Sequence, residues 1–303
     1  MDRSTLTVPM KSVALGKKVG LPRMWTRATR DRAALFGWVV IILVIIMAIA
    51  APLVAPHDPL QQDISARLKP PFWASGGSLE RPLGTDQLGR DILSRIIYGA
   101  RVSLFVGVTA VSIAGVIGIV VGTVAGYYGG LVDEVIMRIV EVRLSIPLIL
   151  LLIAVLAIFG PGLRNVILLL ALTEWVVYAR VVRAEVLSVR EREFIEAARS
   201  IGVPDARIIA LHLLPNVLSS AIVLASVEVG NLIILESTLS FLGIGVLPPT
   251  PTWGNMLGEG RDYLLTAWWL ATFPGLVLAI TVLSINLIGD WLRDWLDPRS
   301  SAA

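Results

Sequence analysis

The 303-residue chain contains no cysteine and only two histidines, and just 16% of its residues are charged. Without cysteine it can form no disulfide, thiol nucleophile or cysteine-based metal site. His57 and His212 are too far apart in the sequence to predict a metal site. Soluble domains have about 25% charged residues. The shortage of charge, together with the apolar pattern described next, excludes an ordinary soluble enzyme, a disordered chain and a fibrous rod.

Hydrophobic residues make up 55% of the chain, and the mean hydropathy is +0.78. They occur in long blocks, and a helix needs about 20 apolar residues to cross a hydrocarbon core of about 30 Å. The pattern predicts an all-α, polytopic membrane protein with about six transmembrane helices. The predicted spans are residues 35–55, 102–126, 145–160, 163–179, 217–242 and 268–289.

The positive charge of the chain indicates its orientation rather than a nucleic-acid partner. The net charge is +3 and the pI about 9.4, but the basic residues cluster beside the apolar blocks. With a cytoplasmic N-terminus, 18 of the 26 Lys and Arg residues lie on the inner side. Cytoplasmic loops carry such an excess, so both termini are predicted to be cytoplasmic. Ala48-Ile49-Ala50 resembles a signal-peptide cleavage site, but the preceding apolar stretch is too long and follows 34 residues, which favours an uncleaved anchor.

The predicted inner loop, residues 180–216, has a distinctive local pattern. Phe194, Ala198 and Ile201 have the spacing of one apolar helical stripe. Gly202 can end that helix in a left-handed conformation, and Pro204 suits the first turn of a second helix. The loop is therefore predicted to be helix, glycine turn, helix. Two interpretations remain open at this point: a solvated amphipathic loop on the membrane surface, or a segment that inserts into another protein's groove.

The order Glu196-Ala197-Ala198, Gly202 and Leu214-Pro215 resembles the EAA motif of ABC-importer permeases. His212 stands where that family usually has an apolar residue. The resemblance implies the type I ABC-importer permease fold. It also implies that Glu196, Ala197, Ala198 and Gly202 form a coupling helix, which docks on a separate ATP-binding subunit.

Three further segments, residues 82–91, 240–245 and 289–294, resemble the second (C-type) permease subunit of the dipeptide/oligopeptide/nickel group. The resemblance covers roughly residues 30–299. It implies a bacterial or archaeal plasma membrane location. The implied partners are a second homologous permease, two ATP-binding subunits, an extracytoplasmic substrate-binding protein and membrane lipid. Short peptides are the expected cargo, with glutathione, nickel complexes and sugars as alternatives.

We divide the chain accordingly. Residues 1–34 are a basic cytoplasmic tail, and residues 35–101 are the first span and an extracytoplasmic loop. Residues 102–290 are a core of five helices that includes the coupling loop 180–216, and residues 291–303 are a cytoplasmic tail.

The outer loop is predicted to contain an interfacial helix. Thr85 or Asp86 can cap its start, and Leu88, Ile92 and Ile96 form an apolar stripe after it. The charged residues of this loop have two interpretations. They stabilise the loop itself, or Asp86 and Arg90 contact the binding protein.

Four polar residues fall within predicted spans: Glu174, Glu228, Asn231 and Glu236. A carboxylate at mid-membrane costs roughly 3 kcal/mol, so such residues usually face a bundle interior or an aqueous cavity. They are predicted either to line the translocation pathway, or to pair with neighbouring helices or lie near a membrane interface. In contrast, small residues recur at every fourth position of the second span, and this spacing indicates close helix packing. They are Ala110, Ala114, Gly118, Gly122 and Gly126.

The chain has no G-x-x-x-x-G-K-[ST] loop, so we expect ATP and Mg²⁺ on partner subunits, with no cofactor, catalytic residue or metal site on this chain. The leading function is therefore a permease subunit of an ATP-driven importer, not an enzyme. An ion-coupled secondary transporter is the alternative, because of the intramembrane carboxylates. An intramembrane hydrolase is disfavoured, since neither G-x-S-x-G nor H-E-x-x-H occurs.

Overall fold

A computed structural model of the chain describes residues 31–296. The predicted tail at 1–34 thus lies almost wholly outside the described residues, and so does the end of the tail at 291–303. Within residues 31–296 the regular elements are helical, apart from one isolated bridge between Thr85 and Asp91. The longer helices are α2 (Arg32–Ile49), α4 (Ile92–Tyr128), α5 (Gly130–Ser145), α6 (Leu148–Phe159), α7 (Leu163–Arg190), α10 (Leu214–Phe241) and α12 (Trp269–Leu296). The shorter elements are α3 (Ala51–Val54), η1 (Ile64–Ala66), α8 (Glu193–Ser200), α9 (Asp205–Ile208), η2 (Ile209–Leu213), α11 (Trp253–Gly260) and η3 (Arg261–Tyr263).

The described helices confirm the prediction of about six spans. Five helices are long and apolar enough to cross a membrane: α2, α4, α7, the continuous segment Asp205–Phe241 and α12. The predicted span at 145–160 is not a single long helix. Its residues form mainly α6, which follows α5 after a bend of 89°. Counting this bent pair as one span gives six.

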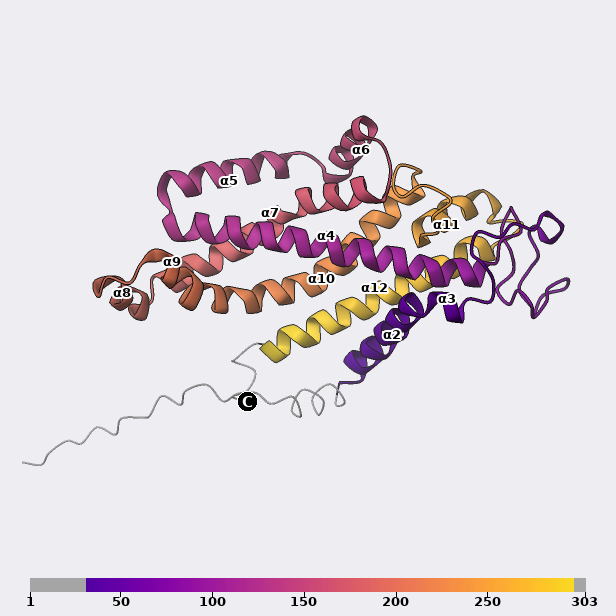
Figure 1. The fold of residues 1–303 in the computed structure, drawn as a ribbon, viewed down its shortest axis with the longest axis horizontal. Helices are drawn as coiled ribbons and strands as arrows, with labels where there is room; N and C mark the ends of the chain where they lie inside the picture. Colours follow the sequence, from indigo (N-terminus) through magenta and orange to yellow (C-terminus); the bar gives the residue numbers. More distant parts are fainter. Residues whose placement is uncertain (1–30, 297–303) are drawn as a thin grey trace, which may run out of the picture.

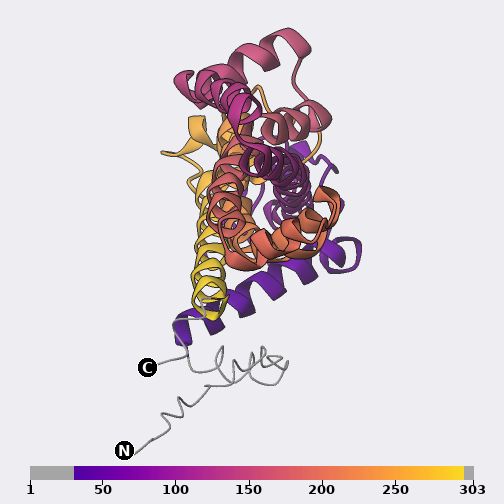
Figure 2. The same cartoon turned by 90° about the vertical axis from the view of Figure 1, so that its left-hand side faces the viewer.

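The molecule is elongated, and its long helices run roughly along the same axis (Figure 1). The small helices α8 and α9 lie at one end, whereas α3, α11 and the long loop after α3 lie at the other. Figure 2 looks along this axis from the end that carries α8 and shows α5 and α6 beside the main bundle. Helix α4 extends along nearly the whole bundle and therefore connects the two ends.

The packing of α4 against α7 confirms the prediction from the small-residue stripe. A Cβ atom on Gly118 would lie 2.3 Å from Cβ of Tyr178, and one on Gly122 would lie 2.6 Å from the Ala179 carbonyl oxygen. Such distances are far below van der Waals contact. The glycines are present because the two helices approach too closely for side chains between them.

The prediction of an interfacial helix in the outer loop is wrong. The chain around Thr85–Asp91 forms a tight turn, and the helix begins only at Ile92. Asp91 is its N-cap, since its carboxylate accepts hydrogen bonds from the backbone N–H and the hydroxyl of Ser94. This helix is α4 itself, so the apolar positions Ile92 and Ile96 belong to the first turns of a membrane-spanning helix.

Two tryptophans attach this outer turn to the rest of the bundle. The indole N–H of Trp253 in α11 donates to the Ile96 carbonyl oxygen at 3.1 Å, and that of Trp269 in α12 donates to the Thr85 carbonyl oxygen at 3.1 Å. Both side chains are buried, and the former packs against Gly99. The outer loop is therefore held by helices from the opposite end of the sequence.

Candidate functional site

The predicted coupling loop has the expected backbone. Helix α8 ends at Ser200, Gly202 adopts φ 78°, and α9 starts after Pro204. The N–H of Val203 donates to the carbonyl oxygen of Ala198 and closes the turn at 3.1 Å. The helix–turn–helix prediction is thus confirmed, and the turn depends on a residue that tolerates positive φ.

The buried face of α8 differs from the predicted stripe. Ile195 and Ala198 are buried, and they pack with Ile208 and with apolar residues of α7 and α10. Phe194 and Ile201, predicted to share a stripe with Ala198, are 43% and 80% exposed. Helix α8 has only eight residues. Which of its side chains are buried is therefore decided by how the helix packs against α7 and α10.

Most of the predicted coupling residues are exposed on the surface of the chain. Glu196, Ala197 and Gly202 are exposed, while Ala198 is 9% exposed and faces the bundle. Two apolar side chains, Phe194 and Ile201, are exposed beside them. This tip lies at the extreme end of the molecule (Figure 1).

The C-terminal end of α4 is attached to both sides of the predicted coupling loop. The hydroxyl of Tyr127 donates to Oδ1 of Asp205 at 2.6 Å, after the loop's glycine turn. The guanidinium of Arg199 lies 5.0 Å from the centre of the Tyr127 ring, a cation–π distance. Before the loop, the guanidinium of Arg190 donates to the Gly126 carbonyl oxygen at 2.8 Å. Sequence analysis missed this arrangement, since Tyr127 lies about 70 residues from the loop and nothing local relates them.

Three of the four predicted pathway residues make ion-pair or amide contacts within the bundle. Glu174 of α7 pairs with Arg143 of α5 at 2.6 Å, and both side chains are largely buried. The side-chain amide of Asn231 donates to Glu228 at 3.4 Å on α10, where Asn231 is exposed. Arg143 was not predicted as a partner of Glu174. In the sequence, the only indication of this partner was the position of Arg143 immediately before an apolar block.

Glu236 occupies a closed position. It is 0% exposed and accepts a hydrogen bond from Ser240 at 2.7 Å, with Ser237 and Ser103 at 3.3 and 3.5 Å. Since Ser103 belongs to α4, the carboxyl group links α4 to α10. Within this chain Glu236 therefore serves packing, and it faces no open path.

At the opposite end, the predicted contact residues Asp86 and Arg90 are part of a buried ion cluster. Asp86 accepts from Arg90 at 2.6 Å and from Arg95 at 2.5 Å. Glu259 of α11 accepts from the same two arginines at 2.8 and 2.7 Å, and from Gln87 at 3.1 Å. Asp86 and Arg90 are only 1% and 4% exposed. They hold the loop in shape and offer little surface for direct contact with another protein.

The charges of this ion cluster shift the pKa of the Glu259 carboxyl group. Burial by itself raises the pKa of the Glu259 carboxyl group, but hydrogen bonding and charge from Arg95 and the charge of Arg90 outweigh it. The pKa of Glu259 is therefore held below its ordinary value. Asp91 takes no part in this cluster and instead serves as the N-cap of α4.

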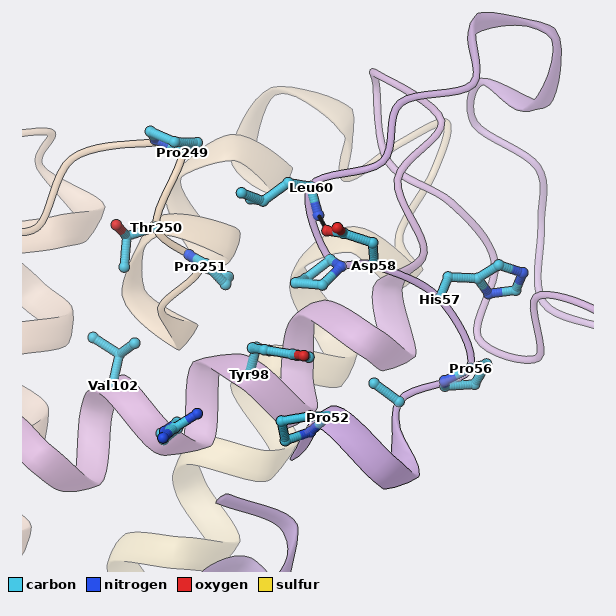
Figure 3. A pocket seen from close by; sticks show the side chains of 13 residues that line it. Pro52, Pro56, His57, Asp58, Leu60, Tyr98, Val102, Pro249, Thr250 and Pro251 are labelled. Atoms are coloured by element: carbon cyan, nitrogen blue, oxygen red, sulfur yellow. Dashed lines mark hydrogen bonds between the residues drawn. The ribbon is translucent and has the colours of Figure 1, made fainter. Parts of the chain in front are cut away.

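A pocket of about 610 Å³ opens between the loop after α3, α4 and the segment before α11 (Figure 3). The loop at His57 and Asp58, the α4 residues Tyr98 and Val102, and the Pro249–Pro251 segment form its walls. Asp58 accepts a hydrogen bond from the Leu60 N–H. The pocket thus joins the two segments that flank the spans at the outer end. Among residues 31–296, no group of three potential metal ligands occurs.

The fold and these two ends define a class: a multi-span helical membrane protein that has an exposed helical loop at one end. Residues 118–302 match the family described as "Binding-protein-dependent transport system inner membrane component", and residues 22–71 match the "N-terminal TM domain of oligopeptide transport permease C". The chain belongs to this family of ABC-importer permeases, as a C-type subunit of the dipeptide/oligopeptide/nickel group. It is a permease subunit and not an enzyme.

The relatives agree along most of the chain. It is 41% identical to the di/tripeptide transport system permease protein DppC of Pseudomonas aeruginosa (strain UCBPP-PA14), over 92% of each chain. It is 42% identical to the dipeptide transport system permease protein DppC of Haemophilus influenzae, over 93% of this chain and 96% of the relative. The inward-facing MetNI methionine ABC transporter has the same fold, with a TM-score of 0.54 and 23% identity over 68% of this chain and 98% of the other. An amino acid ABC transporter has a TM-score of 0.53 at 16% identity, over 67% of this chain and 95% of the other.

Proposed function

We propose that this chain forms half of the translocation pathway of an ATP-driven importer of dipeptides and other short peptides. The observation that carries the proposal is the exposed helix–glycine turn–helix at Glu193–Ile208, which α4 holds through Tyr127 and Arg190. The cargo is inferred from the printed functions of the relatives at 41% and 42% identity.

The proposed assembly contains a second, homologous permease and two ATP-binding subunits, on which ATP and Mg²⁺ are held. An extracytoplasmic binding protein delivers the peptide. The coupling residues Glu196, Ala197, Ala198 and Gly202 dock on one ATP-binding subunit. Nucleotide-driven closure of the ATP-binding subunits would then move this loop, and Tyr127 and Arg190 would pass the movement to α4.

In this proposal the chain lies in a bacterial inner membrane with both termini in the cytoplasm. Residues 102–290 form the core, and residues 180–216 form its coupling loop. Glu174, Glu228 and Asn231 are the candidates for the pathway, and exposed Asn231 has the best access to it. Asp86 and Arg90 contribute to binding-protein contact by shaping the outer loop around Glu259.

The experiment is peptide uptake by proteoliposomes that contain the purified assembly, with ATP on the side of the ATP-binding subunits and loaded binding protein on the other. We expect Glu196→Lys to abolish ATP-dependent uptake of a labelled dipeptide, because it reverses a charge on the exposed docking surface. Asp262→Lys is the matched control, since Asp262 is exposed at the opposite end. Normal uptake by Glu196→Lys would contradict the docking assignment.

The cargo is tested separately in the same vesicles. Unlabelled dipeptides should compete with the labelled dipeptide, whereas a sugar or a nickel complex should not. Uptake that persists without ATP but collapses with an ion gradient would instead establish the ion-coupled carrier.

A further inference from the structure

An apolar groove runs between α2 and α4 on the surface of the described chain. Its volume is about 480 Å³, and its floor is formed by Val229 of α10 and Ile285 of α12. Ile41, Ile45 and Ile49 of α2 form one wall, and Leu104, Phe105 and Val108 of α4 form the other. Several of these side chains are half exposed or more, including Ile49 at 75% and Phe105 at 55%.

The groove lies within the hydrocarbon region of the membrane. Both walls belong to helices that are long and apolar enough to span it, and no charged residue occurs on α2 after Arg32. The lining residues lie between Ile41 and Ile49 on α2 and between Arg101 and Thr109 on α4. Each stretch rises by about 12 Å along its helix axis. The medium that fills such a groove is an acyl chain, because water gains no hydrogen bonds from these side chains.

One end of the groove carries a positive charge. Arg101 lines the groove and also the pocket of Figure 3, which Pro52 and Asp58 line as well. The charge therefore lies at the outer end of α2, where the apolar stretch stops. Among residues 31–296, no hydrogen bond or ion pair of Arg101 occurs.

A guanidinium without a counter-charge at the edge of the hydrocarbon region is unfavourable in free energy. An anion that accepts its hydrogen bonds reduces this free-energy cost. The membrane itself supplies such an anion at this depth, since the phosphodiester of a phospholipid lies directly above its acyl chains. A phospholipid joins a phosphate and an acyl chain in one molecule. The chain likewise places Arg101, which can bind the phosphate, beside the groove that can hold the acyl chain.

We propose that a phospholipid of the outer leaflet binds this chain, with an acyl chain between α2 and α4 and its phosphate on Arg101. The headgroup then points toward the pocket of Figure 3, where Asp58 can accept a hydrogen bond from an amine. The bound lipid fills the gap between the first span and the core. The site rests only on the membrane-spanning fold, so it does not depend on the cargo or on the coupling loop.

The test begins with native mass spectrometry of the full assembly in a mild detergent. We expect tightly bound phospholipid on the wild-type assembly and a loss of occupancy of roughly fivefold or more in Arg101→Gln, from the contribution of one arginine to lipid attraction. Arg101→Lys should retain part of the binding. Arg164→Gln, at an exposed arginine at the start of α7, is the matched control and should bind like the wild type.

Titration of the delipidated assembly identifies the chemistry. Phosphatidylglycerol and phosphatidylethanolamine should both bind, and diacylglycerol with the same acyl chains should not. A clear preference for phosphatidylethanolamine would support the contact with Asp58. Equal binding of diacylglycerol, or unchanged phospholipid on Arg101→Gln, would overturn the proposal.

A protein occupant is distinguished by cross-linking. The chain contains no cysteine, so Phe105→Cys can carry a single benzophenone group. Adducts with phospholipid are expected after illumination. Adducts with the second permease alone would show that a helix of that subunit fills the groove, and would exclude the lipid.

Discussion

The hydroxyl of Tyr127 lies 2.6 Å from Oδ1 of Asp205, although the two residues are 78 positions apart. Tyr127 is in the last turn of α4, and Asp205 starts the helix after the coupling turn. At its other end the same helix begins at Ile92, with Asp91 as its N-cap, and is anchored by Arg95 in the ion cluster. One continuous helix of 37 residues therefore connects the predicted coupling loop to the loop that precedes Ile92.

This connection predicts a coupling defect in Tyr127→Phe. A hydrogen bond to a charged group contributes about 1.5–3 kcal/mol, so its loss should loosen the loop from α4 without removing the buried ring. We expect the ratio of peptide uptake to ATP hydrolysis to fall several-fold, measured in proteoliposomes. Tyr128→Phe is the matched control, because Tyr128 is 56% exposed and donates no hydrogen bond among residues 31–296.

The pair is isolated by a double-mutant cycle. Asp205→Asn should reproduce part of the defect, and adding it to Tyr127→Phe should cause little further loss. Additive effects of the two substitutions would mean that the hydrogen bond is not the connection.

Gly202 is predicted to be limited by its backbone conformation and not by space. Its φ is 78°, and no atom lies within 4 Å of a Cβ built there. Gly202→Val should therefore distort the coupling turn, at a cost of about 1–2 kcal/mol, and reduce co-purification of the ATP-binding subunit. Gly202→Asn should retain much more of it, since asparagine tolerates this region. Equal effects of both substitutions would point to a direct contact with the partner instead.

Gly118 is predicted to be limited by space. A Cβ there would meet the Tyr178 Cβ at 2.3 Å and the Trp175 carbonyl oxygen at 2.6 Å. Gly118→Ala should force α4 and α7 apart and destabilise the chain by about 1–3 kcal/mol, measured as a lower midpoint of thermal aggregation in detergent. Val116→Ala, at a 63% exposed position of α4, should change little. A Gly118→Ala protein as stable as Val116→Ala would contradict the close packing.

Glu259 predicts how stability depends on pH. Its pKa in the folded protein is below the ordinary value of 4.5. Its stabilising effect is therefore fully present above that value and is lost as the pH falls through the pKa of the folded state. Glu259→Gln should be less stable at neutral pH by about 3 kcal/mol, because Arg90 and Arg95 lose a buried counter-charge.

Denaturation in detergent between pH 3 and 7 measures this effect. The wild-type protein should lose stability toward the acid end, and Glu259→Gln should lose less. Asp262→Asn removes an exposed ion pair with Arg261 and should cost less than about 1 kcal/mol. If the stability of Glu259→Gln depended on pH in the same way as that of the wild type, the Glu259 carboxyl group would be excluded as the source of the acid-induced loss of stability.

The orientation of the spans predicts the sides from which single cysteines react. Ser188, near the inner end of α7, and Leu265, fully exposed between α11 and α12, suit this test because the chain has no cysteine of its own. We expect an impermeant maleimide to label Leu265→Cys in intact cells and Ser188→Cys only after the membrane is opened. Labelling of both from one side would contradict the predicted topology.

The sequence by itself determined the class of fold and the helix–glycine turn–helix at residues 193–208. Apolar block length predicted the spans because a helix must cover a fixed hydrocarbon thickness. Gly202 and Pro204 predicted the turn because their effects on the backbone are local. The spacing of Gly118 and Gly122 predicted close packing, although it could not name α7 as the partner.

The tertiary structure alone decided which side chains meet. Asp86, Arg95 and Glu259 form one ion cluster, and Tyr127 binds Asp205, because helices distant in sequence lie side by side. The same packing buries Ile195 and leaves Phe194 exposed, whereas the sequence predicted an apolar stripe that included Phe194. Periodicity shows that a helix has an apolar side. Only the neighbours of the helix decide which residues that side finally includes.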